Sequence, residues 1–240
     1  MIYIFNSAKF LMTQFFILSL SAVLLYFLVP IGGYLDLTLI QPWLALDGQF
    51  YLKDTWSLSQ LSHHYVKYVL ELIYLLFGLL SLKFISNPWG KIQAWQYAYF
   101  FCMVCLATIF IAALKQLTNH ACPWDLTEQT SAGYIWNLTQ KLGHCFPGGH
   151  ASCGFALMTG YFVFRKQYIG LARFFLYSGV ILGFFMGWAQ MMRGAHFLSH
   201  NLWSAWWVWM LNVVCYALIY LPIDERKTQT RLRFVDDQEA

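Results

Sequence analysis

Six long apolar stretches constrain the fold of this 240-residue chain more than any other feature. A helix needs about 20 consecutive apolar residues to cross a bilayer, and it must satisfy its backbone hydrogen bonds internally. Hydrophobic residues make up 59% of the chain and charged residues only 11%, which excludes an ordinary soluble domain. The sequence predicts an all-α, polytopic membrane protein, a single integral domain over residues 1–240, with six transmembrane helices near 10–31, 64–84, 94–116, 150–166, 170–191 and 198–221.

The basic residues divide unequally between the two ends of the predicted bundle. The end that carries more Lys and Arg is cytoplasmic by the positive-inside rule. That end carries Lys9, Lys83, Lys91, Arg165, Lys166, Arg173, Arg226, Lys227, Arg231 and Arg233, and the other end carries Lys53, Lys67, Lys115, Lys141 and Arg193. An even number of spans puts both termini on one side, so we expect both in the cytoplasm, with residues 224–240 as a cytoplasmic tail.

The histidines all fall on the predicted outer side: His63, His64, His120, His144, His150, His196 and His200. Clustered ionisable groups in a membrane protein indicate a functional site, so we expect the active face to look away from the cytoplasm. Residues 32–63 lie on the same side and include three acids, Asp36, Asp47 and Asp54. Part of this segment is predicted to lie along the membrane interface as an amphipathic helix.

Two cysteines stand at opposite ends of one predicted outer loop. Cys122 and Cys145 would lie in a compartment that permits disulfides, so they are candidates for a bridge. The other four cysteines lie inside predicted spans, where a thiol behaves as a small apolar group.

Three polar clusters between residues 115 and 204 belong to this outer side. They are Lys115 to Asp125, the turn Pro147-Gly148-Gly149-His150, and Arg193 to Asn201. Two glycines let the backbone approach an oxyanion closely, and a helix beginning after them would add N–H donors. The turn therefore indicates an anion site with an imidazole beside it.

The order of these clusters resembles the type 2 phosphatidic acid phosphatase family, which is related in fold to the vanadium haloperoxidases. That family carries Lys-x6-Arg-Pro, Pro-Ser-Gly-His and Ser-Arg-x5-His-x3-Asp on a six-helix membrane core. The resemblance covers roughly residues 94–221. Cys122 stands at the arginine position of the first motif and Gly148 at the serine position of the second, whereas the matching residues are Lys115, Pro123, Pro147, Gly149 and His150.

The third motif fits in two registers. The run from His196 to Ser199 resembles the Gly-Gly-His-Phe-Leu-Ser-Asp form of bacterial lipid A phosphatases, and it puts His200 at the aspartate position. Arg193 would then lie about one turn from His196 if the segment is helical, close enough to meet the same phosphate. The other register takes His200 as the family histidine and puts Ser204 at the aspartate position. We prefer the first register because four consecutive residues agree.

The resemblance implies phosphoryl transfer with named roles. His196 would be the nucleophile, His150 the general acid and base, and His200 the orienting group. Asp125 and Glu128 are candidates for an orienting carboxylate in the outer loop. No metal and no cofactor is implied, and the groups that would bind the phosphate are Lys115, Arg193 and the backbone amides of Gly148 and Gly149.

The implied function is that of a metal-independent membrane phosphatase. Its substrate would be a lipid phosphate monoester or a polyprenyl diphosphate, at the periplasmic face of a bacterial inner membrane, with membrane lipids around it and no nucleic acid partner. A lipid phosphotransferase and a catalytically inactive lipid-binding relative stay open, as does the oligomeric state. A metal transporter is disfavoured, because the spans hold almost no acidic residue except Glu71.

Overall fold

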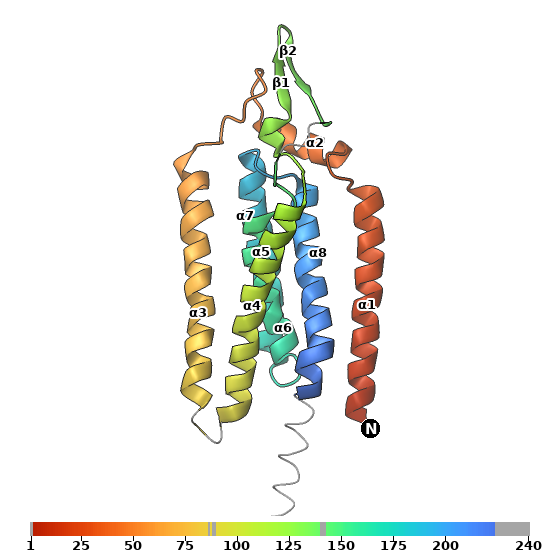
Figure 1. Ribbon diagram of the computed structural model, residues 1–240, viewed down its shortest axis with the longest axis vertical. Helices are drawn as coiled ribbons and strands as arrows, with labels where there is room; N and C mark the ends of the chain where they lie inside the picture. The colour runs from red at the N-terminus through yellow and green to blue at the C-terminus, as the bar shows by residue number, and fades with distance from the viewer. Residues whose placement is uncertain (1, 86, 88–89, 140–142, 224–240) are drawn as a thin grey trace, which may run out of the picture.

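The computed structural model describes residues 2–85, 87, 90–139 and 143–223. Its elements, in which η marks short 3-10 or π-helical segments, are α1 (Ile2–Leu28), α2 (Tyr34–Ile40), η1 (Gln41–Trp43), η2 (Ser57–Tyr65), α3 (Val66–Ile85), α4 (Lys91–Leu117), η4 (Pro123–Asp125), β1 (Thr127–Thr130), β2 (Gly133–Trp136), α5 (Gly149–Phe155), η5 (Ala156–Met158), α6 (Thr159–Phe164), α7 (Ile169–Met192), α8 (Leu198–Cys215) and η6 (Tyr216–Tyr220). The long helices stand side by side, α2 lies across one end of them, and the hairpin β1–β2 projects beyond that end (Figure 1).

Within the described residues, five helices are long and apolar enough to cross a membrane: Ser7–Leu28, Val66–Ile85, Lys91–Leu117, Ile169–Met192 and Leu198–Ile223. The predicted span at 150–166 instead forms the shorter succession α5, η5 and α6. Residues 151–160 within it are all buried, so other helices rather than lipid surround this part of the chain. The protein is thus an all-α membrane protein, and the predicted count of six spans holds approximately.

Glycines let α5 and α7 approach each other closely. A Cβ atom added to Gly154 of α5 would lie 2.5 Å from the backbone nitrogen of Gly183 of α7. A Cβ on Gly183 would in turn lie 2.2 Å from the ring of Phe155. Small residues at such contacts are the usual means by which membrane helices pack tightly. This contact packs the last turn of α5 against the middle of α7.

Two indole hydrogen bonds attach α1 to α8. Trp206 donates Nε1–H to the backbone oxygen of Leu18 at 3.0 Å, and Trp209 donates to Oε1 of Gln14 at 3.0 Å. Much of the rest of α1 faces away from the protein, since large side chains such as Phe16 and Phe27 are exposed. The indole bonds therefore supply directional contacts where helix packing is sparse.

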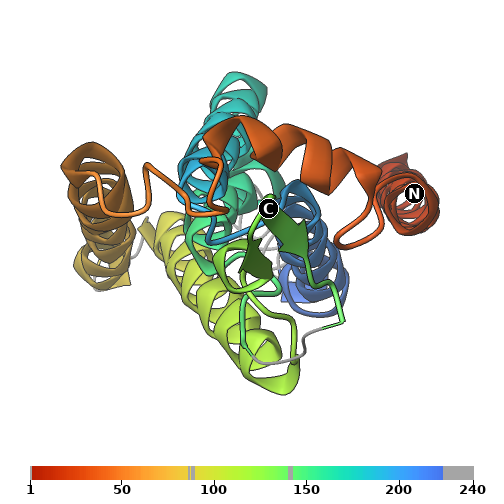
Figure 2. The ribbon, with the colours of Figure 1, turned by 90° about the horizontal axis from the view of Figure 1, so that it is seen from above.

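The outer segment forms a cap over one end of the bundle. Helix α2 lies across this end and not along the bundle axis (Figures 1 and 2). Tyr34 of α2 is exposed, whereas Asp36 and Ile40 are buried. The segment thus contains a short helix with one buried and one exposed side, and its placement at the membrane interface stays a prediction. A second apolar cluster, here called the cap cluster, joins the segment to the outer loop and to the start of α8 through Ile40, Phe50, Ala121, Leu126 and Phe197.

The basic residues of the described chain divide between the two ends as predicted. Lys115 lies in the last turn of α4 and Arg193 directly follows α7, both at the capped end. Lys83 and Lys91 lie at the opposite end, where α3 and α4 meet. Lys141 and the predicted tail at 224–240 lie outside the described residues.

The candidate disulfide is formed in the structure. Cys122 and Cys145 are bonded, with their Cα atoms 5.1 Å apart, which is a normal separation for a bridge. The bond ties the start of the outer loop to the residues just before the Pro-Gly-Gly-His turn. It closes the loop that carries η4 and the hairpin.

Gly154 provides a test of the close helix contact. The Gly154→Ala variant should lower the free energy of unfolding by about 1–3 kcal/mol, because the new methyl group forces backbone to move. Gly170→Ala is the matched control: no atom lies within 4 Å of its added Cβ, so its effect should stay within about 0.5 kcal/mol. Thermal unfolding of both purified variants in detergent measures the difference. Equal melting temperatures would contradict the close packing of α5 on α7.

Candidate active site

Two imidazole rings from the third cluster lie together beside the start of α8. His200 sits in the first turn of α8, and His196 lies two residues before that helix begins. Their ring centroids are 5.8 Å apart, and the ring of His120 lies 6.4 Å from that of His200. His196 and His200 are both buried. The structure therefore brings histidines from the first and third clusters to one place.

The connection between α7 and α8 is not helical, so the predicted helical turn from Arg193 to His196 is wrong. Gly194 adopts a left-handed conformation with φ of 76°. Its N–H donates to the carbonyl of Met191, and the N–H of Ala195 donates to the carbonyl of Gln190, both at 2.9 Å. This pair of bonds is the glycine-terminated helix end known as the Schellman motif. The signal was present in the sequence, since glycine directly after an apolar helix predicts a C-terminus.

The guanidinium of Arg193 holds the outer segment. Its Nε–H donates to the backbone oxygen of Lys53 at 2.8 Å, and a terminal nitrogen donates to Oε1 of Gln190 at 3.3 Å. Burial lowers the pKa of this guanidinium, and nearby Asp54 opposes the shift. Arg193 carries five N–H donors, so these two contacts do not use its full capacity.

His200 is fully buried between aromatic rings. Its ring centroid lies 5.5 Å from that of Phe146 and 5.4 Å from that of Phe197. Among the described residues, neither ring nitrogen of His200 has a hydrogen-bond partner of normal geometry. Its backbone oxygen accepts bonds from the N–H of Gly148 at 3.1 Å and from the hydroxyl of Ser204 at 2.8 Å. The serine of the alternative register thus contacts backbone oxygens and not the imidazole.

The Pro-Gly-Gly-His turn is joined to α8 by these bonds. Because the N–H of Gly148 already donates to His200, this predicted phosphate donor is engaged within the protein. Gly149 is the first residue of α5 and His150 the second, and N–H groups in a first helical turn have no acceptor within their helix. A Cβ at Gly148 would lie 2.5 Å from Oδ1 of Asn201, whereas one at Gly149 would meet nothing. The side chain of Asn201 explains why glycine stands at position 148.

Lys115 lies in the last turn of α4, half-buried, close enough to His200 to interact with it electrostatically. Across the described ranges, the ion pair found is Lys67 with Glu71 on α3, so Lys115 has no acidic partner there. An ammonium group without an acidic partner near the imidazole of His200 gives this end of the bundle a site suited to an anion.

Neither predicted outer-loop acid joins the buried histidines. Asp125 is exposed and accepts a bond at 3.0 Å from the indole of the adjacent Trp124. Glu128 is exposed as well and accepts a bond from Asn137. Within the part of the chain that the structure describes, no three His, Cys, Asp or Glu side chains gather as a metal site.

The buried carboxylate near the histidines is Asp36, which the sequence did not single out. One of its oxygens accepts the backbone N–H of Ser199 at 2.8 Å, and the other accepts the hydroxyl of Ser199 at 2.5 Å and the N–H of Gly32 at 2.9 Å. Burial raises the pKa of Asp36, and these hydrogen bonds offset part of the rise. An acid in a predominantly apolar stretch was the available signal, but its partner lies 163 residues away.

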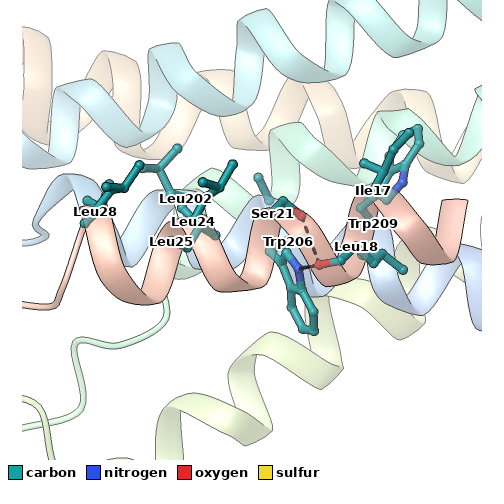
Figure 3. Close-up of a pocket in the computed structure, with 11 residues that line it drawn as sticks. Ile17, Leu18, Ser21, Leu24, Leu25, Leu28, Leu202, Trp206 and Trp209 are labelled. Carbon is teal, nitrogen blue, oxygen red and sulfur yellow. Dashed lines mark hydrogen bonds between the residues drawn. The ribbon is translucent and has the colours of Figure 1, made fainter. Parts of the chain in front are cut away.

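An apolar groove runs between α1 and α8 (Figure 3). Its volume is about 420 Å³, within the usual size range of small-ligand sites. Leu28 and Leu202 line one end, and Ile17 and Trp209 line the other. Leu202 follows His200 by two residues on α8, so this end of the groove lies level with His200 along the helix, on a different face of α8. The lining suits a hydrocarbon chain.

Comparison with known proteins identifies the family. The family model described as the PAP2 superfamily matches residues 96–223, more than half of the chain. This range begins in α4 and includes the Pro-Gly-Gly-His turn, His196 and His200. No curated protein and no solved structure matches the chain. The chain therefore belongs to the PAP2 superfamily, a family of helical membrane proteins that are generally phosphatases acting on phosphate esters.

Proposed function

We propose that this protein is a membrane phosphatase that hydrolyses a lipid phosphate monoester or a polyprenyl diphosphate through a phosphohistidine on His196. The observation that carries the proposal is the meeting of distant segments at the start of α8. There the rings of His196 and His200 lie 5.8 Å apart, and Lys115 is close enough to interact with His200. A cation and a nucleophilic imidazole at one buried place match the needs of phosphoryl transfer.

The proposed reaction has two steps. An imidazole nitrogen of His196 attacks phosphorus, the bond from phosphorus to the leaving oxygen breaks, and His150 donates a proton to that oxygen. Water then attacks the phosphohistidine, His150 takes the proton from the water, and the bond between phosphorus and nitrogen breaks. Inorganic phosphate leaves and both histidines return to their starting states. His200 packs against His196 and would fix the orientation of its ring.

The charge of the transferred group would be balanced by Lys115, by Arg193 and by the first backbone N–H groups of α5. Lys115 lacks an acidic partner in the described chain, and Arg193 has donors beyond its two contacts. Because the N–H of Gly148 donates to His200, the amide of Gly149 is the better candidate of the two glycines. Such preorganised donors act on charge that develops in the transition state.

The groove between α1 and α8 supports a lipid as substrate. Its lining is apolar, apart from Ser21, and a hydrocarbon chain in it would run along the same helix that begins at the histidines. Burying each methylene group of such a chain is worth about 0.8 kcal/mol. A phosphate at the start of α8 with its hydrocarbon tail in the groove would satisfy both features at once.

We further propose that the site faces the periplasm of a bacterial inner membrane and that both termini are cytoplasmic. The capped end carries the histidines, whereas Lys83, Lys91 and Arg165 gather at the opposite end. Lys and Arg concentrate on the cytoplasmic side of membrane proteins. The bridge between Cys122 and Cys145 at the capped end suits an oxidising compartment.

Replacing His196 and His200 by Gln, one at a time, shows which of them is the nucleophile and which is the orienting group. His196→Gln should reduce phosphate release at least about 1,000-fold, because no nucleophile remains, whereas His200→Gln should keep a measurable fraction. The purified protein is assayed on phosphatidic acid, phosphatidylglycerol phosphate, undecaprenyl diphosphate and lipid A. His144→Gln is the matched control, because His144 is exposed and bonds the backbone of Thr118, and it should retain full activity.

Trapping the intermediate identifies the nucleophile directly. Rapid denaturation at alkaline pH during turnover should leave phosphate on the peptide that contains His196. Phosphate found on His200 would show that the alternative register is correct. Free phosphate as product supports hydrolysis, whereas its appearance on an added lipid acceptor would identify a phosphotransferase. An inactive wild-type protein across the whole panel would favour a lipid-binding relative.

Activity is predicted to be independent of metal ions. Mg²⁺ prefers several oxygen ligands, and the nearest outer-loop acids are exposed and point to Trp124 and Asn137. Phosphate release by purified protein should therefore be unchanged in excess EDTA. Loss of activity in EDTA with recovery on addition of Mg²⁺ or Zn²⁺ would refute the proposed mechanism.

The orientation is tested with two matched cysteine variants. Gln129→Cys lies in the exposed outer hairpin, and Gln167→Cys lies in the turn between α6 and α7 at the opposite end. In intact spheroplasts, a membrane-impermeant thiol reagent should label Gln129→Cys and leave Gln167→Cys unlabelled until the membrane is broken. The reverse pattern would place the histidines in the cytoplasm and overturn the proposed periplasmic site.

A further inference from the structure

The connection between α7 and α8 is held by residues that precede the family-matched region. Arg193 donates to the backbone of Lys53, and a Cβ added to Gly194 would lie 2.4 Å from the ring of Phe50. Phe197 packs in the cap cluster with Phe50. Asp36 bonds Ser199 twice. The match to the family begins at residue 96, so all these partners come from the outer segment.

Asp36 serves as the cap that α8 lacks in its own sequence. The residue at the N-cap position is Phe197, whose side chain makes no capping bond. The carboxylate of Asp36 accepts the N–H of Ser199, the second residue of α8, as an N-cap side chain normally does. A negative charge at this end of α8 also meets the positive end of the helix dipole. A residue of α2 thus completes the first turn of α8.

We propose that Asp36 is a positioning residue that fixes His196 and His200 for phosphoryl transfer by holding the first turn of α8. This inference rests on the proposed function. Ser199 directly precedes His200 and follows His196 by three residues. A movement of Ser199 therefore moves both imidazoles, and a displacement of about 1 Å can cost about 100-fold in rate.

Asp36 acts through Ser199 and not by touching the substrate. Its carboxylate is fully buried and already accepts three hydrogen bonds, from two groups of Ser199 and from the N–H of Gly32. A carboxylate facing an anionic phosphate would repel it. The hydrogen bonds of Asp36 hold its carboxylate at the start of α8. The groups that would bind the phosphate are therefore Lys115 and the backbone amides of α5.

Hydrogen exchange measures, independently of activity, how firmly Asp36 holds the first turn of α8. In purified Asp36→Asn, the amides of residues 195–202 should exchange at least about 10-fold faster than in wild type, because the capping bond is weakened. The control is Asp47→Asn, which removes an exposed carboxylate of the same segment that accepts a bond from Gln49. Its exchange over residues 195–202 should match wild type. Equal exchange in Asp36→Asn and wild type would overturn the proposal.

Kinetics on phosphatidic acid in detergent micelles separate positioning from binding. Asp36→Asn should lower kcat about 10- to 100-fold with KM within about 2-fold, because the reacting geometry changes and substrate contacts do not. Ser199→Ala removes only the hydroxyl bond and keeps the amide bond, so its loss should be smaller. Ser199→Thr keeps both the amide and the hydroxyl donor, so its kcat should stay close to that of wild type.

Hydrogen exchange and kinetics together distinguish a failure of this inference from a failure of the proposed function. Faster exchange with unchanged kcat would show a cap that does not position the histidines, which overturns the inference and leaves the proposed function intact. A rise in KM alone would make Asp36 a binding group, which also contradicts the inference. If wild type releases no phosphate from any lipid, the proposed function fails and the catalytic part of the inference falls with it. Faster exchange in Asp36→Asn together with lowered kcat supports the proposal.

Discussion

The contact between Gly154 of α5 and Gly183 of α7 sets how closely these two helices pack. Apolar side chains gain little from leaving lipid for protein, so close backbone approach supplies much of the attraction between membrane helices. Here a single added carbon would overlap backbone atoms. The contact keeps α5 inside the bundle, where residues 151–160 are buried. The Pro-Gly-Gly-His turn then emerges beside α8 and bonds the backbone of His200.

Two parts of the chain meet at the start of α8: the family-matched region and the outer segment that precedes it. The family-matched region supplies Lys115, His150, His196 and His200, and the outer segment supplies the carboxylate that caps the helix. The cap cluster adds an apolar contact around Phe197 at the same joint. The region that carries the proposed reacting groups therefore depends on a second segment to cap the first turn of α8.

The sequence predicted features that depend on local composition. Long apolar runs identified the membrane helices, and the positions of Lys83 and Lys115 separated the two ends correctly. Features set by contacts between distant residues were missed. The partner of Asp36 lies 163 residues away, and the N–H of Gly148 donates to a residue of another helix. The bend after Arg193 was not predicted either, although Gly194 directly after an apolar helix is a local signal for a helix end.

The indole bonds between α1 and α8 bear on the position of Asp36, which lies beyond the end of α1. Trp206 donates to an oxygen of Leu18 (Figure 3), and Trp209 donates to an oxygen of Gln14. These two bonds fix the position of α1 along the axis of α8. Asp36 follows α1 after only a short turn. A slide of one residue along the helix axis is about 1.5 Å, enough to take the carboxylate out of hydrogen-bond reach of Ser199. Two bonds between α1 and α8 thus set the position, along the bundle axis, of the carboxylate that caps α8.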